Sequence, residues 1–208
     1  MGGTRAMALS DCARVLPGFS VAGRIEHDPD GTHQLILTKH LVDGVPYRYQ
    51  KADELRIAPR ARAEEYLVIP GDVLFMSRGT RNRAWVIAAV QPLTIAPVSF
   101  YRLRPGPMID AEYLAWFLNQ PAAQTAIGQV RTGAGTPLVQ RQGFEQIEVL
   151  VPPLDRQRAI AALGRSLAEE RLLRQRLADA TERLHQALGQ AIIQDLRQPA
   201  PGALEARP

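Results

Sequence analysis

Arginine dominates the possible chemistry of this 208-residue chain, which has 23 Arg and only 2 Lys. The stretch 73–109 contains no acidic residue, but it contains five arginines: Arg78, Arg81, Arg83, Arg102 and Arg104. The stretch 113–144 also lacks acids and holds Arg131 and Arg141. Guanidinium groups pair with phosphate and with the guanine edge, so a surface of one charge sign favours a nucleic-acid partner. The alternative is chance clustering in a chain whose preference for Arg and Ala reflects a GC-rich genome, and charge alone does not decide between the two.

Two polar segments within these acid-free stretches have the composition of ligand-binding loops. The first follows a turn and a strand-like run at 70–76, and its candidate DNA-binding residues are Arg78, Thr80, Arg81, Asn82 and Arg83. The second, 131–141, is rich in glycine, so backbone amides can approach a phosphate closely. Its candidates are Arg131, Thr136, Gln140 and Arg141. Arginine and asparagine can read guanine and adenine edges. The alternatives are a solvated hairpin loop for the first segment and a plain connector for the second.

The residue patterns of the common active sites are missing from the sequence. A phosphate-binding loop ends in Gly-Lys-Ser/Thr, and no lysine follows Lys51. A nuclease is also disfavoured, because neither Lys39 nor Lys51 has an acid two positions before it. Val-Pro-Pro-Leu at 151–154 differs from the Asp/Asn-Pro-Pro-aromatic motif of DNA amino-methyltransferases, since valine has no acceptor and leucine cannot stack on a base. We therefore expect no catalytic residue. A nuclease or methyltransferase that works alone ranks third, after a DNA-binding protein and after a protein–protein interaction module.

Neither a metal nor a cofactor is expected. His27, His33 and His40 have no cysteines or acidic triad around them, so we predict local hydrogen bonds or solvation instead of zinc ligation. Cys12 is the only cysteine, which excludes an intrachain disulfide and favours a reducing, cytoplasmic location. No apolar run approaches the roughly 18 residues that a membrane span needs, so no membrane partner is expected. With 46% hydrophobic residues, the chain has enough apolar side chains for a core.

The elements that would position the two loops indicate an α+β fold with a mixed, mostly antiparallel sheet and short helices. Apolar runs of strand length lie at 34–37, 66–69, 73–76, 84–90, 98–103 and 147–151. Asp110 is a good N-cap for a first helix, in which Leu114, Phe117 and Leu118 share one face. Pro121 interrupts this helix, and a second short helix is predicted after it.

A single long helix is predicted over 155–196, because this stretch follows two prolines and contains none. Its heptad-like stripe holds five leucines that we expect at a helix–helix interface: Leu163, Leu167, Leu177, Leu184 and Leu188. A helix of about 60 Å cannot fold back along a domain of about 150 residues, so a partner helix is predicted from another copy or another chain. The alternative is an amphipathic helix on its own domain. The expected domains are 1–151 (globular), 152–197 (a coiled-coil dimerisation or spacer helix) and 198–208 (a disordered tail).

Taken in order, these features resemble one half of a type I restriction–modification specificity subunit. A Gly-Asp-hydrophobic-Leu strand with a short Arg/Gly loop lies at 71–79, and a Tyr-Leu-x-x-x-Leu helix at 113–118 precedes a small-residue loop at 132–137. The family's Pro-Pro-Leu-x-x-Gln-x-x-Ile junction is matched at Pro152, Pro153, Leu154, Gln157 and Ile160. The chain departs from the family in Arg156, where Glu is usual, and in having one recognition domain and one long helix instead of two of each.

The resemblance implies a target-recognition domain for double-stranded DNA that has no active site of its own. Its partners would be an N6-adenine DNA methyltransferase subunit and, as a further candidate, a restriction or translocase subunit. The chain would bind one half-site of a bipartite target. Two copies that pair their long helices would form a homodimer and present identical readers to a palindromic bipartite site. The alternative is a coiled-coil protein–protein interaction module that does not read DNA.

Overall fold

The computed structural model describes residues 3–59, 62–133 and 135–197. The predicted tail, 198–208, lies outside the described residues. The chain divides into two compact units, Met1–Ala168 and Glu169–Pro208. Within the described ranges, no helix combines the length and the apolar character that crossing a membrane requires.

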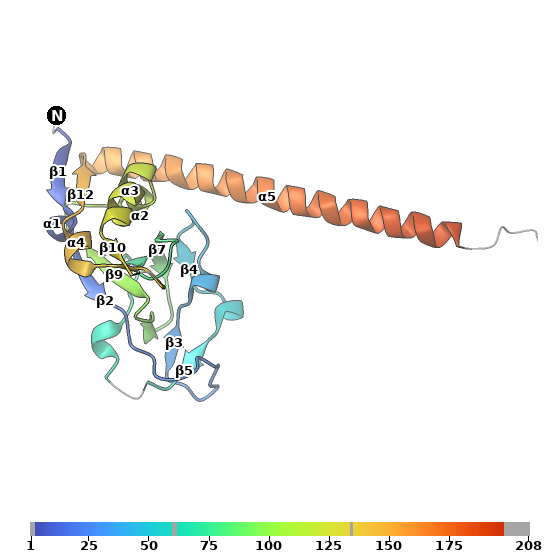
Figure 1. Ribbon diagram of the computed structural model, residues 1–208, viewed down its shortest axis with the longest axis horizontal. Helices are drawn as coiled ribbons and strands as arrows, with labels where there is room; N and C mark the ends of the chain where they lie inside the picture. The colour runs from blue at the N-terminus through green and yellow to red at the C-terminus, as the bar shows by residue number, and fades with distance from the viewer. Residues whose placement is uncertain (1–2, 60–61, 134, 198–208) are drawn as a thin grey trace, which may run out of the picture. The chain divides into compact units, whose positions relative to one another are not determined.

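The first unit combines short strands with short helices (Figure 1). Its strands are β1 (Arg5–Ala8), β2 (Ala13–Pro17), β3 (His33–Leu35), β4 (Tyr47–Arg48), β5 (Arg56–Ile57), β6 (Val73–Met76), β7 (Ala84–Ala89), β8 (Thr94–Ile95), β9 (Phe100–Pro105), β10 (Arg131–Thr132), β11 (Leu138–Val139) and β12 (Glu148–Val151). Its helices are α1 (Leu9–Cys12), α2 (Ala111–Leu118), α3 (Pro121–Gln129), α4 (Arg141–Glu145) and the three 3-10 turns η1 (Thr38–His40), η2 (Lys51–Asp53) and η3 (Glu64–Tyr66). Helix α5 (Leu154–Leu196) begins in the first unit and continues into the second.

The largest sheet has five strands in the order β2-β9-β6-β7-β4. All its neighbouring strands are antiparallel except β4 and β7, which run parallel. A three-stranded sheet, β5-β3-β8, combines an antiparallel and a parallel pair. Two further antiparallel pairs join β1 to β12 and β10 to β11. The predicted α+β class with a mixed, mostly antiparallel sheet is therefore confirmed.

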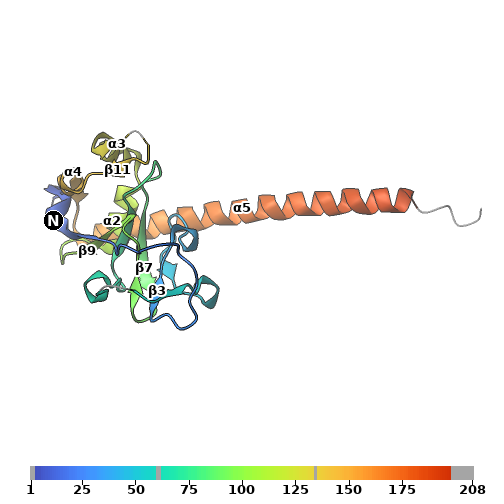
Figure 2. The same ribbon diagram turned by 60° about the horizontal axis from the view of Figure 1, so that its bottom comes forward.

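Strand β6 explains why residues 73–76 form an unbroken apolar run: the sheet is buried on both faces. Val73 and Phe75 belong to the core cluster that includes residues of α2, α3 and α4. Leu74, which points to the opposite face, belongs to a second cluster with Trp85 and Ile87. Figures 1 and 2 place α3 and α4 toward one end of this unit and β3 toward the other.

Helix α2 has the predicted N-cap. The Asp110 carboxylate accepts a hydrogen bond from the backbone N–H of Tyr113 at 3.0 Å, which satisfies one of the free donors of the first turn. Leu114 and Leu118 are fully buried, and Phe117 packs at the edge of the same cluster. The helix stops before Pro121, which occupies the first turn of α3.

The strand predicted at 66–69 is wrong. The 3-10 turn η3 ends at Tyr66, the first residue of this run, and Leu67 makes only an isolated bridge to Ile95. Arg102 is the physical reason, because its buried guanidinium donates to the carbonyl oxygens of Leu67 and Glu65. Carbonyls bonded to a side chain are not available for a continuous ladder.

Helix α5 begins within one residue of the prediction, but its first part belongs to the globular unit. Gln157, Ala161 and Ala168 are buried, so the first unit extends to Ala168, beyond the boundary expected at residue 151. In the second unit every described residue from Leu173 to Arg197 is exposed. Large apolar side chains are exposed along α5, including Leu163, Leu167, Leu173, Leu177, Leu184, Leu188, Ile192, Ile193 and Leu196.

Candidate nucleic-acid interface

The two loops predicted separately from the sequence lie against each other. Strand β6 leads into the first, 77–83, and β10 and β11 enclose most of the second, 131–141. The backbone N–H of Gly79 donates to the carbonyl of Pro137 at 2.7 Å, and the N–H of Val139 donates to the carbonyl of Ser77 at 2.8 Å. We call these two segments the loop pair. Backbone hydrogen bonds therefore join the two segments, and both segments carry exposed side chains.

Helix α3 and Arg131 add further contacts to the loop pair. The Arg131 guanidinium donates to the carbonyl of Thr80 at 3.3 Å and to the side-chain oxygen of Asn82 at 3.5 Å. The Gln124 amide of α3 donates to the carbonyl of Asn82 at 2.7 Å. These bonds tie the first loop to the helix that precedes the second, so the surface is held from two sides.

Most of the predicted binding residues have exposed side chains. The exposed candidates are Arg78, Thr80, Arg81, Thr136, Gln140 and Arg141. Among the loop-pair arginines that form ion pairs, Arg81 has the most exposed side chain, at 84%. Gln140 donates to the Thr132 hydroxyl at 2.7 Å, and Arg141 forms an ion pair with Glu145 at 2.7 Å. Arg83 and Arg131 are half-buried.

Asn82 is the exception among the candidates, because it is only 2% exposed. Its amide donates to the carbonyls of Met76 at 2.9 Å and Gly79 at 3.3 Å, across the turn that Gly79 makes with a φ of +88°. A short amide side chain often closes a turn in this way. Asn82 therefore shapes the loop, and its burial disfavours the prediction that its side chain contacts DNA.

Two of the five arginines in the acid-free stretch 73–109 do not contribute to a surface for phosphate. Arg102 is buried and donates to backbone carbonyls. Arg104 forms an ion pair with Asp72 at 2.9 Å, and Asp72 is only 1% exposed. The hydrogen bonds that Arg104 donates to the Asp72 carboxylate hold the pKa of Arg104 above its usual range, so this charge stays paired. The positive surface is thus made by the loop pair, not by the whole stretch.

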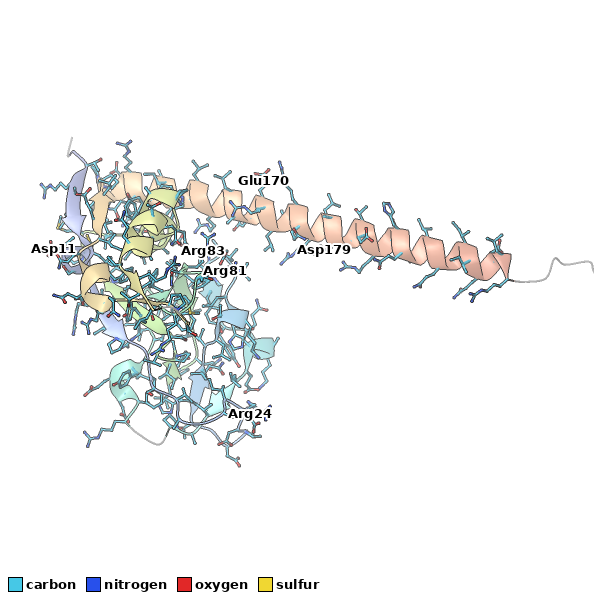
Figure 3. The ribbon with its side chains drawn as sticks, in the orientation of Figure 1. Asp11, Arg24, Arg81, Arg83, Glu170 and Asp179 are labelled. Carbon is cyan, nitrogen blue, oxygen red and sulfur yellow. The ribbon has the colours of Figure 1, made fainter. Side chains whose placement is uncertain are left out.

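Two residues outside the predicted segments complete the site. The Asp43 carboxylate lies 3.5 Å from an Arg81 nitrogen and 3.7 Å from Arg83 Nε. Figure 3 shows Arg81 and Arg83 side by side. The Asn119 side chain exchanges two hydrogen bonds with the backbone of Ala84, at 3.0 and 2.8 Å, and the backbone carbonyl of Asn119 accepts from Arg83 at 3.4 Å. Neither residue belongs to a sequence motif, so only the tertiary structure reveals them.

The three N-terminal histidines make local hydrogen bonds. His27 Nδ1 accepts from the backbone N–H of Arg56 at 3.1 Å, and His40 Nδ1 accepts from that of Leu37 at 3.2 Å. His33 is buried beside the Thr32 hydroxyl. Burial lowers the pKa of His40, which favours its neutral form. Among the residues described, no group of His, Cys, Asp and Glu is arranged to hold a metal ion.

Solved structures with the same fold come from type I restriction–modification systems. A chain from a study of complex assembly and conformational transition of the type I R-M system has a TM-score of 0.66 and 18% identity, covering 93% of this chain and 45% of that chain. An HsdS subunit from Thermoanaerobacter tengcongensis has a TM-score of 0.61 and 17% identity, covering 92% of this chain and 44% of its own. This chain therefore spans less than half the length of these two chains. No protein-family model and no curated protein matches its sequence.

Proposed function

We propose that this chain, which has the fold of a type I restriction–modification specificity subunit, is a DNA-reading subunit that performs no chemistry itself. The observation that carries the proposal is the loop pair. Two polar loops about fifty residues apart in sequence are joined by backbone hydrogen bonds, and together they expose arginine, threonine and glutamine side chains. These side chains supply phosphate contacts and bidentate contacts to base edges. No cofactor takes part in this role.

Two copies of the chain would bind a bipartite palindromic site, each reading one half-site. This part of the proposal rests on α5, whose apolar side chains in the second unit are exposed. Glu170 and Arg174 interrupt the stripe, and they form an ion pair with each other one turn apart at 2.5 Å, so this polar interruption carries no net charge into the seam. The assembled pair would dock an N6-adenine DNA methyltransferase, and a restriction or translocase subunit, in the cytoplasm.

Replacing Arg81 with alanine tests the DNA-reading role. If Arg81 contacts a base, we expect the free energy of specific binding to weaken by about 1–3 kcal/mol. If it contacts only phosphate, we expect the slope of log affinity against log salt concentration to become shallower by about 1. The measurement is duplex binding by fluorescence anisotropy across a salt series. Arg24→Ala is the matched control, because Arg24 is also strongly exposed and is paired with Glu26 outside the loop pair. Unchanged affinity and salt slope in Arg81→Ala would contradict the assignment.

The same salt series separates DNA reading from the alternative, a coiled-coil interaction module. Only a DNA reader loses affinity linearly on a log–log salt scale, because its cations displace counterions from phosphate. The exposed apolar stripe is the feature that favours the alternative. An interaction module would show no salt-dependent duplex binding at all.

Introducing arginine at Leu184 and Leu188 tests the helix pairing. These side chains are 57% and 52% exposed, so the double variant should fold normally but lose the dimer, because two charges would enter an apolar seam. Light scattering at high micromolar concentration reports the change. Arginine at Gln186 and Gln190 adds the same charges two positions further along, on the opposite face, and should leave the dimer intact. A monomeric wild-type chain would contradict the symmetric pair.

A further inference from the structure

Asp43 is an acidic residue outside the loop pair, and its carboxylate contacts three side chains. One oxygen accepts a hydrogen bond from the indole N–H of Trp85 at 3.1 Å. The other lies 3.5 Å from Arg81 and 3.7 Å from Arg83. Trp85 is buried in the five-stranded sheet, so its N–H fixes the carboxylate at the edge of the site.

The backbone around Asp43 is fixed as well. Gly44 has a φ of +77°, and a Cβ atom at this position would lie 2.4 Å from the Cβ of Ala168 on α5. Only glycine combines this conformation with such a close approach. The backbone N–H of Val45 closes the turn by donating to the carbonyl of Val42 at 3.2 Å. The carboxylate that faces the two arginines is therefore bonded to Trp85 of the sheet, and it follows a backbone that passes close to α5 at Gly44.

The two arginines differ in how much freedom this carboxylate leaves them. Arg83 is 40% exposed, and it contacts both Asp43 and the carbonyl of Asn119. Arg81 is far more exposed and contacts Asp43 through one terminal nitrogen. A guanidinium has five N–H donors, so one contact leaves enough donors for a bidentate bond to a guanine edge. The negative charge of Asp43 also repels phosphate, which favours a base edge as the ligand of Arg81.

We propose that Asp43 is a specificity-determining positioning residue, which orients Arg81 toward a base edge and disfavours its use on the phosphate backbone. The inference rests on the proposed DNA-reading function. It assigns the two arginines different roles: Arg81 contacts a base edge, and Arg83 pairs with the Asp43 carboxylate and helps to hold it in place. Discrimination between DNA sequences then depends on an acid that would be expected, from charge alone, to weaken DNA binding.

Asp43→Asn tests this inference, because it removes the charge and keeps the shape. The probes are a duplex that the wild-type chain enriches from a randomised library and a scrambled duplex of the same composition. We expect the ratio of the two affinities to fall by about tenfold, as for the loss of one oriented bidentate contact. Binding to the scrambled duplex should become tighter, and its log–log salt slope steeper by about 0.9, because Arg81 gains a phosphate contact.

Two further variants separate positioning from a structural role. Asp11→Asn removes an exposed carboxylate from α1, outside the loop pair, and should leave the ratio and the salt slope unchanged (Figure 3). When Arg81 is already replaced by alanine, adding Asp43→Asn should cause no further loss of discrimination. A fall in both affinities, or an equal loss with and without Arg81, would overturn the inference.

Failure of the proposed function gives a different result. If the wild-type chain binds neither duplex, DNA reading itself is wrong, and the role of Asp43 falls with it. If the wild-type chain discriminates between the duplexes but Asp43→Asn does so equally well, DNA reading stands and only the role of Asp43 is overturned.

Discussion

Replacing Phe144 with alanine should lower the free energy of unfolding by about 3–5 kcal/mol, as expected for deleting a fully buried aromatic ring. Phe144 lies on α4, directly after the second loop, and it is fully buried. Its ring centroid is 4.2 Å from that of Phe75 and 5.8 Å from that of Tyr101. The Tyr101 hydroxyl donates to the carbonyl of Val139 at 2.8 Å, so this aromatic group also supports the loop pair.

Urea unfolding followed by circular dichroism measures the effect of Phe144→Ala. Phe144→Leu should lower the free energy of unfolding by less than Phe144→Ala does, because leucine fills part of the cavity. Leu150→Ala on the neighbouring strand β12 is the surface control, since Leu150 is exposed, and should change stability by about 0.5 kcal/mol or less. A loss in Phe144→Ala no larger than that of Leu150→Ala would show that α4 does not pack on the sheet as described.

Gln157→Ala should destabilise the chain by about 3 kcal/mol, because it removes a buried side chain and leaves three partly or fully buried backbone groups without partners. Gln157 is 0% exposed. Its side-chain oxygen accepts from the backbone N–H of Asp110 at 2.8 Å, and its amide donates to the carbonyls of Met108 at 3.0 Å and Pro152 at 2.7 Å. One side chain therefore joins the start of α5 to the start of α2 and to the end of β12.

Gln175→Ala on the same helix is the matched control for Gln157→Ala. Gln175 is exposed, and its amide bonds only the Asp179 carboxylate one turn away, at 2.8 Å. The free energy of unfolding of the control should lie within about 0.5 kcal/mol of the wild-type value. Equal stabilities of the two variants, measured by urea unfolding, would mean that Gln157 does not bridge the three segments.

Sequence patterns predicted the helices and strands that depend mainly on residues close to one another in the chain. The N-cap at Asp110, the apolar run of β6 and the proline-free stretch of α5 each appear in the structure where the sequence indicated. The failure at 66–69 has a long-range cause: Arg102, more than thirty residues away, takes the carbonyl of Leu67. No pattern of apolar residues can reveal a competitor so distant in sequence.

The candidate site was predictable in composition but not in arrangement. Arginine-rich and glycine-rich segments drew attention to the two loops, and the structure joins them through Ser77, Gly79 and Val139. The same composition did not reveal that Asn82 would turn inward. Asp43 could not be found either, because a single acid in a loop becomes informative only when the fold brings it to Arg81.

The structure gives a physical reason for the junction motif around Gln157. Its two prolines end β12 and start α5, and Gln157 sits at the first buried position of that helix. The glutamine bonds three backbone groups that no other side chain satisfies among the contacts of the described residues. A helix that begins at this point needs such a residue, since buried backbone groups must be paired.

The central claim is that this chain selects DNA sequence and acts as a symmetric pair. Selection of duplexes from a randomised library by the purified wild-type chain, followed by sequencing of the bound fraction, tests both parts together. We predict enrichment of two inverted copies of one half-site, separated by a spacer of unconstrained sequence. Enrichment of no sequence, or of a single undivided motif without inverted symmetry, would contradict the claim.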